Sequence, residues 1–123
     1  MASQDVSEAL TGDAGAPLLA LDDLPPGSFA EGEAMVDGAA ESLVVHRDAS
    51  GAVRAWLNVC PHAGRRLDWA PGRFLVSKDG LLVCAVHGAS FEPVGGLCEA
   101  GPCRGESLRA VAVAVRDGAV WLA

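Results

Sequence analysis

Short apolar segments separated by turn residues are the feature that most limits how this chain can fold. From Pro17 onward no segment repeats its apolar residues at the helical spacing of about 3.6; they alternate or run for a few positions. Fifteen glycines and seven prolines fit the turns between these segments. Three hairpins are predicted, which pair residues 43–46 with 53–57, 74–76 with 81–83, and 111–115 with 119–122. The sequence therefore predicts an all-β fold, a small sandwich or barrel.

The charged residues are distributed unequally along the chain. Residues 1–41 contain nine acidic residues and no basic one, whereas residues 42–123 contain seven acidic and nine basic residues. The total charge of −7 argues against nucleic acid and anionic membranes as partners, because both bind basic surfaces. Residues 1–15 consist mostly of Ser, Ala, Gly and acidic residues, so we predict a disordered acidic tail followed by one domain at residues 16–123.

The sequence also bears on the cellular compartment. Its first residues lack the basic and apolar regions of a signal peptide, and no apolar run approaches the roughly 20 residues of a membrane span. Four cysteines are too few for a disulfide scaffold but enough for a metal site. We therefore expect a cytoplasmic protein.

Cysteine and histidine occur together twice, each time in a tight turn at the end of a predicted strand. Cys60 and His62 are separated by one residue, and Cys84 and His87 by two. Zinc sites usually leave about two to four residues between paired ligands, so one zinc ion fits the first pair poorly. A binuclear iron–sulfur centre fits better if each loop gives its cysteine to one iron and its histidine to the other.

These motifs and their flanking residues resemble the Rieske [2Fe–2S] family. The Cys-x-His and Cys-x-x-His motifs follow the family's order, and residues 56–59 and 87–91 provide matching context. Gly101-Pro102 resembles the family's proline loop, which covers the cluster. The resemblance runs from about residue 18 to residue 122 and points to a small soluble Rieske-type ferredoxin or a stand-alone bacterial Rieske protein. It implies a Rieske-like antiparallel sandwich with two loops at one tip, whose ligands to one [2Fe–2S] cluster are Cys60, His62, Cys84 and His87.

Departures from the family's high-potential members predict a low reduction potential. Those members carry an extra cysteine in each cluster loop, where this chain has Arg65 and Val86. They also place a Ser and a Tyr hydroxyl near the cluster, where this chain has Ala89 and Phe91. A hydroxyl bonded to sulfur stabilises the added electron, so losing both hydroxyls lowers the potential. The gap between the motifs is also longer than usual, which is expected to lengthen a hairpin near residues 73–80 without affecting the ligands.

The resemblance implies a one-electron carrier rather than an enzyme. The iron held by His62 and His87 would take up the electron near the surface, and a flavin reductase, an oxygenase or another oxidoreductase would be the redox partner. A catalytic oxygenase subunit needs a second iron, typically held by about two histidines and a carboxylate, and only His46 remains for it. Two alternatives stay open: an accessory Rieske subunit of a larger oxidoreductase complex, and a zinc-stabilised or redox-sensing interaction module.

Several residues outside the motifs carry weaker signals. Cys98 and Cys103 are interpreted as ordinary reduced thiols, with a short-loop disulfide or a redox-sensitive pair as the alternative. His46 is interpreted as a packing or surface residue of a strand. The three tryptophans are interpreted as core or rim aromatics, and the ring of Trp69 either shields the cluster or simply packs.

Basic residues follow the first motif closely. We expect Arg65 and Arg66, together with Arg104, to border the face on which a redox partner docks. That face would then be neutral to basic although the whole chain is acidic.

Overall fold

The computed structural model describes residues 16–61, 64–84 and 88–123, so the predicted tail at residues 1–15 lies outside the described residues. Within those ranges the chain forms β-strands and one short 3-10 helix, and no helix there is long and apolar enough to cross a membrane. The elements in chain order are β1 (Leu19–Ala20), η3 (Leu21–Asp23), β2 (Phe29–Val36), β3 (Ala39–Arg47), β4 (Val53–Leu57), β5 (Leu75–Val76), β6 (Leu82–Val83), β7 (Ser90–Phe91), β8 (Cys98–Ala100), β9 (Ala110–Val111), β10 (Val113–Arg116) and β11 (Ala119–Leu122).

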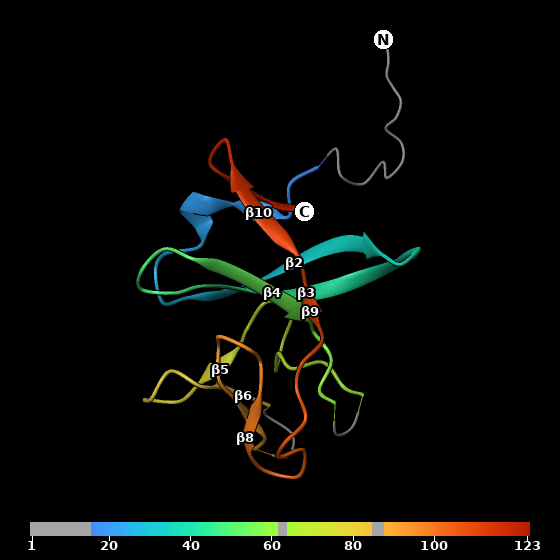
Figure 1. Ribbon diagram of the computed structural model, residues 1–123, viewed down its shortest axis with the longest axis vertical. Helices are drawn as coiled ribbons and strands as arrows, with labels where there is room; N and C mark the ends of the chain where they lie inside the picture. Colours follow the sequence, from blue (N-terminus) through green and yellow to red (C-terminus); the bar gives the residue numbers. More distant parts are fainter. Residues whose placement is uncertain (1–15, 62–63, 85–87) are drawn as a thin grey trace.

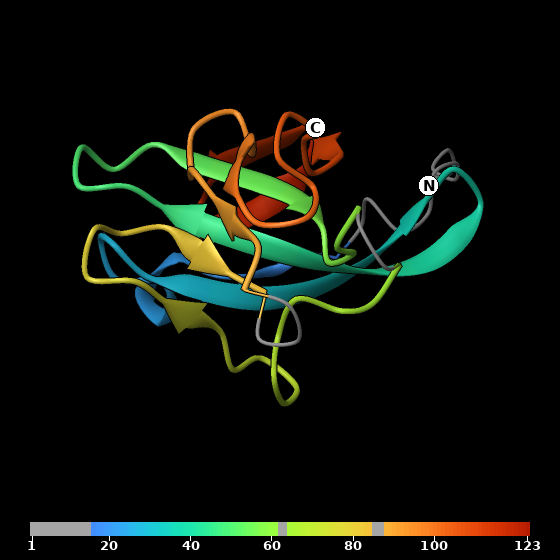
Figure 2. The same ribbon diagram turned by 90° about the horizontal axis from the view of Figure 1, so that it is seen from below.

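Three antiparallel sheets follow one another along the long axis of the molecule (Figure 1). The upper sheet has the strand order β1-β11-β10, the central sheet β2-β3-β4-β9, and the lower sheet β5-β6-β7-β8. Seen from below, the yellow and orange strands of the lower sheet lie in front of the central sheet (Figure 2). The predicted all-β antiparallel fold is confirmed.

The central sheet buries both of its faces. Leu43 and Val45 of β3 pack into the core that the central sheet shares with the upper sheet, whereas Val44 between them packs into the core that contains the lower sheet. In β4, Ala55 packs into the core shared with the upper sheet, and Trp56 packs into the core that contains the lower sheet. Successive side chains of a strand point to opposite faces, so an unbroken apolar run is what a strand between two cores requires.

The three predicted hairpins are present, but the segment predicted as the first strand of the last hairpin divides between two sheets. β3 pairs with β4, β5 with β6, and β10 with β11, all antiparallel. The alternation at residues 111–115 predicts a single strand, but the chain changes sheets at Ala112, so that β9 pairs with β4 and β10 with β11. A period of two cannot reveal this change, because the side chains alternate in the same way on both sides of the crossing.

The β2–β3 hairpin is not among the predicted ones. Asp37 and Gly38 form its turn with φ of 53° and 85°, and positive φ at both turn residues is typical of a two-residue hairpin loop. Asp117-Gly118 forms the same turn between β10 and β11. The Asp37-Gly38 dipeptide therefore marks this hairpin turn in the sequence. The acidic and small residues of β2 lack the apolar pattern by which a strand is predicted.

His46 is a packing residue of β3, as predicted. It is 5% exposed, and its ring stacks on Phe29 with the centroids 4.1 Å apart. Its Nδ1–H donates to the carbonyl of Ser28 at 2.9 Å. Burial lowers the pKa of His46 below its ordinary value, although the hydrogen bond to Ser28 opposes this shift. A neutral ring fixed in this way is a structural group.

Candidate metal centre

The first motif lies in a loop that the backbone closes tightly after β4. The N–H of Cys60 donates to the carbonyl of Arg65 at 2.7 Å, and the N–H of Gly64 donates back to the carbonyl of Cys60 at 2.8 Å. Gly64 has a φ of 67°, in the left-handed region that favours glycine. The loop therefore begins at a cysteine and turns back at a glycine.

The second motif lies in a loop with the same hydrogen-bond pattern after β6. The N–H of Cys84 donates to the carbonyl of Ala89 at 2.7 Å, and the N–H of Gly88 donates to the carbonyl of Cys84 at 2.9 Å. Gly88 has a φ of 73°. The two loops are far apart in the sequence but share one backbone pattern. Each has a cysteine at its first position and a glycine with positive φ at its fifth.

The two cysteines that begin these loops belong to one core. Cys60 and Cys84 are both 0% exposed, and both lie in the buried cluster that contains Leu67 and Phe91. Neither forms a disulfide. Thiolates are costly to bury in apolar surroundings unless a cation is bound to them, so this pair is suited to a buried metal centre.

His62 and His87 lie outside the described residues. In the part of the chain that the structure describes, no three Cys, His, Asp or Glu side chains gather as a metal site. Cys98 and Cys103 therefore do not complete a four-thiolate site with the two loop cysteines.

A buried amide fixes the outer end of the first loop to the central sheet. Asn58 is 1% exposed, and its Oδ1 accepts a hydrogen bond from the N–H of Leu67 at 2.8 Å. Its Nδ2 donates to the Oγ of Ser42 on β3 at 3.1 Å, and that hydroxyl donates to Glu31 on β2 at 2.6 Å. Asn58 thus connects strands β2 and β3 with the segment that follows the first motif.

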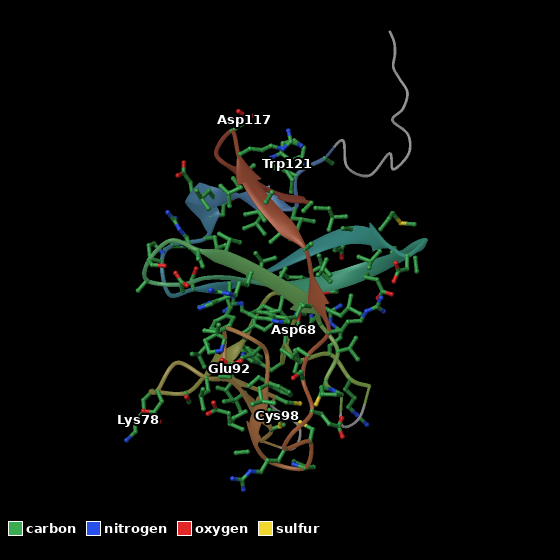
Figure 3. The ribbon with its side chains drawn as sticks, in the orientation of Figure 1. Asp68, Lys78, Glu92, Cys98, Asp117 and Trp121 are labelled. Atoms are coloured by element: carbon green, nitrogen blue, oxygen red, sulfur yellow. The ribbon has the colours of Figure 1, made fainter. Side chains whose placement is uncertain are left out.

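Arg66 is part of this network rather than a free surface charge. Its guanidinium forms hydrogen bonds with both carboxylate oxygens of Asp68 and with Glu31 at 2.8–2.9 Å. The Asp68 side chain is 1% exposed and also accepts from the N–H of Gly72 (Figure 3). Burial alone would raise the pKa of Asp68, but Arg66 and Gly72 hold it below its ordinary value. Two carboxylates therefore neutralise Arg66, which braces the loop while its side chain stays 47% exposed. Its place on a docking face stays a prediction.

The glycine of the predicted proline loop contacts the second cysteine loop. Gly101 has a φ of 96°, and a Cβ added to it would lie 2.7 Å from the Cα of Ala89. Real side chains do not approach so closely, so only glycine allows this contact. Ala89 is the residue whose carbonyl closes the second loop, so the segment at Gly101-Pro102 packs against that loop.

The remaining residues singled out in the sequence lie in different surroundings. Trp56 is a core residue at 2% exposed, whereas Trp69 is 59% exposed, and the Arg73 guanidinium lies 5.9 Å from the centre of its ring. Trp69 therefore neither packs in the core nor belongs to the cluster of buried residues around Cys60. Lys78 extends into solvent from the tip of the β5–β6 hairpin (Figure 3), which is where the extra residues between the motifs were expected.

A family model supports the interpretation of the two loops. The model of the Rieske [2Fe–2S] domain matches residues 16–115. The chain belongs to the Rieske [2Fe–2S] domain family. Membership implies one [2Fe–2S] cluster and supports a role in electron transfer, so the predicted cofactor is confirmed. The paired buried cysteines on two matching loops fit that cluster.

Solved structures share the fold of this Rieske domain. Sphingomonas yanoikuyae B1 ferredoxin is 22% identical, and the match covers 87% of this chain and 95% of that chain with a TM-score of 0.61. The terminal oxygenase of carbazole 1,9a-dioxygenase from Nocardioides aromaticivorans IC177 is 24% identical, with coverages of 86% and 29% and a TM-score of 0.67. The quaternary ammonium Rieske monooxygenase CntA is 23% identical, with a TM-score of 0.64. The match covers 86% of this chain but only 30% of the monooxygenase. No curated protein matches the chain in sequence.

Proposed function

We propose that this Rieske domain is a low-potential one-electron carrier that passes electrons between a reductase and an oxygenase or other oxidoreductase. The observation that carries the proposal is the pair of matching loops, each beginning at a fully buried cysteine. Cys60 and Cys84 would hold one iron, and His62 and His87 the other. When bound, the cluster accepts and releases one electron.

The residues of the chain supply position and burial for this chemistry. The backbone hydrogen bonds of each loop fix its cysteine, and Asn58 and Asp68 brace the first loop from outside. The core around Cys60 and Cys84 excludes water from the thiolates. A rigid site that excludes water lowers the reorganisation energy of a change in charge. A low reorganisation energy favours fast electron transfer, which an electron carrier requires.

The surroundings of the second loop favour a low reduction potential. Ala89 and Phe91 are 0% exposed and carry no hydroxyl. The hydroxyl of Ser90, which lies between them, donates to the carbonyl of Gly88 at 3.3 Å. It is thus directed at the backbone, and none of the three residues offers an O–H donor to a ligand sulfur.

The midpoint potential tests this proposal. We expect a value below about +100 mV, in the lower part of the roughly −150 to +300 mV range of Rieske centres. Ala89→Ser combined with Phe91→Tyr is expected to raise it by about 40 mV or more, since one hydrogen bond contributes about 1 kcal/mol. Protein-film voltammetry measures both values, with Ser90→Ala as the control that leaves the potential unchanged. A wild-type value above +100 mV would contradict the low-potential assignment.

The carrier role predicts an exposed docking face with a charge preference. With Arg66 neutralised, Arg65 and Arg104 remain exposed without an ion pair among the described residues. Arg65→Glu is expected to slow reduction by a flavin reductase several-fold at low salt, and the difference should shrink as the salt concentration rises. Lys78→Glu makes the same charge change at the tip of the β5–β6 hairpin and serves as the control. Equal rates for both variants in stopped-flow experiments would exclude Arg65 from the docking face.

An accessory subunit of a larger oxidoreductase is the second candidate. This chain corresponds to about 30% of the length of a Rieske monooxygenase and to nearly all of a Rieske ferredoxin. Purification from the native source distinguishes the two, since a subunit co-purifies with its partner at fixed stoichiometry. The expected cytoplasmic location and the absence of membrane and nucleic-acid partners belong to the same proposal.

A further inference from the structure

Cys98 and Cys103 form a second pair of sulfur atoms that the proposed electron transfer does not use. Their Sγ atoms are 2.7 Å apart, about 0.7 Å more than the length of a disulfide bond. Both residues are 1% exposed and lie in the same core as Cys60 and Cys84. Only a small movement separates the two thiols from a covalent bond.

The backbone holds the two cysteines in a short closed loop. The N–H of Cys98 donates to the carbonyl of Glu106 at 2.7 Å, and the N–H of Glu106 donates to the carbonyl of Cys103 at 2.8 Å. The N–H of Gly105 donates to the carbonyl of Cys98 at 3.1 Å. A bond between the sulfurs would therefore cross-link a loop whose ends are already held together.

This loop is the one that contacts the second cluster loop. Gly101 lies between the two cysteines and packs directly on Ala89, which closes the loop that begins at Cys84. A covalent bond from Cys98 to Cys103 would restrict the opening of this contact. The state of the two sulfurs is thus connected to the retention of the cluster.

A surface hollow borders Cys98, although the residue itself is only 1% exposed. The hollow has a volume of about 400 Å³ and is lined by Leu97, Cys98, Glu99, Arg104 and Gly105. Cys98 lines this hollow and Cys103 does not, and Arg104 supplies a cation that would attract a small thiol compound with carboxylate groups. Figure 3 shows Cys98 in the lower part of the molecule, within the lower sheet.

We propose that Cys98 and Cys103 are a redox-active dithiol, and that its oxidation by a low-molecular-weight disulfide locks the loop at Gly101-Pro102 onto the second cluster loop. The Cys98 thiolate attacks the small disulfide, forms a mixed disulfide and releases one small thiol. Burial raises the pKa of the Cys103 thiol to about 12, so this thiol gives its proton to the departing small thiolate as its sulfur attacks the Cys98 sulfur. The internal bond forms and the second small thiol is released. Two electrons and two protons pass from the cysteines to the small disulfide, so the step is balanced.

Alkylation of the holoprotein tests the covalent step. The protein is equilibrated in glutathione buffers from fully reduced to fully oxidised, quenched in acid, alkylated in denaturant and analysed by peptide mass spectrometry. We expect Cys98 and Cys103 to lose alkylation together, with the loss of two hydrogen atoms from their peptide. Complete alkylation of both residues in every buffer, or a stable glutathione adduct on Cys98 without the internal bond, would overturn the proposal.

The rate of iron release to a chelator tests the locking step. We expect the oxidised holoprotein to release iron about tenfold more slowly than the reduced holoprotein, because the cross-link restricts opening of the loop. Cys103→Ala should release iron at one rate in both buffers, which assigns the difference to this pair. Equal rates for the two states of the wild type would overturn the lock. Neither measurement involves a redox partner, so failure here is distinct from failure of the proposed carrier role.

Discussion

Replacing Cys60 or Cys84 with alanine is expected to abolish the bound iron and acid-labile sulfide. Each substitution removes one of the two thiolates that would hold the same iron, so that iron would keep a single protein ligand. The wild type should contain two irons and two sulfides per chain, as the family's [2Fe–2S] cluster requires. Chemical iron and sulfide determination, together with the visible spectrum and the paramagnetic signal of the reduced protein, measures the loss.

Cys98→Ala provides a matched control for this result. Cys98 is a cysteine of the same core and is 1% exposed, but it lies outside the two loops. The variant is expected to keep both irons and both sulfides. If it lost as much iron as Cys84→Ala, the two loops would not be the specific ligand sites. His87→Ala extends the test to the imidazole ligands, since an unchanged spectrum in that variant would exclude His87. A colourless wild type containing zinc would contradict the cluster itself.

Asn58→Ala is expected to lower the free energy of unfolding by about 3 kcal/mol. The substitution leaves the N–H of Leu67 buried without its acceptor, deprives the Ser42 hydroxyl of a donor and opens a small cavity. Thermal unfolding followed by circular dichroism should show a decrease in Tm of about 10 °C. Because Asn58 braces the segment after the first motif, the rate of iron release should rise as well.

Ser42→Ala separates the role of Asn58 in the loop from its role in the strands. This variant removes the hydroxyl that joins Asn58 to Glu31, but it leaves the hydrogen bond from Leu67 to Asn58 intact. We expect a loss of about 1 kcal/mol and an unchanged rate of iron release. If both variants released iron at the wild-type rate, the amide would contribute to stability but not to the position of the loop.

The fold class could be predicted because its signals are local. The apolar runs of β3, β4 and β11, and the Asp-Gly turn before β11, follow from residues that are neighbours in the chain. The β2–β3 hairpin was missed because β2 alternates small and acidic residues, although Asp37-Gly38 marks its turn. The change of sheet at Ala112 had no local signal, since it depends on which strand lies beside each half of the segment.

The sequence predicts a ligand set for the candidate site, but it could not predict the surroundings of the two loop cysteines. The Cys-x-His and Cys-x-x-His spacing carries the chemistry, and the family match supports that interpretation. The ion pair between Arg66 and Glu31, which are 35 residues apart in the sequence, was not predicted. A count of charges along the chain cannot detect such a pair.

The sequence by itself determined that this chain is an all-β Rieske domain, because turn residues and the spacing of the Cys and His motifs are properties of short segments. Only the tertiary structure decided that the two loops share one hydrogen-bond pattern, that Arg66 is a brace, and that the sulfurs of Cys98 and Cys103 lie 2.7 Å apart beside the cluster loops. These features depend on hydrogen bonds, ion pairs and packing between segments that folding brings together. Contacts of this kind are set by three-dimensional proximity, which the order of residues along the chain does not reveal.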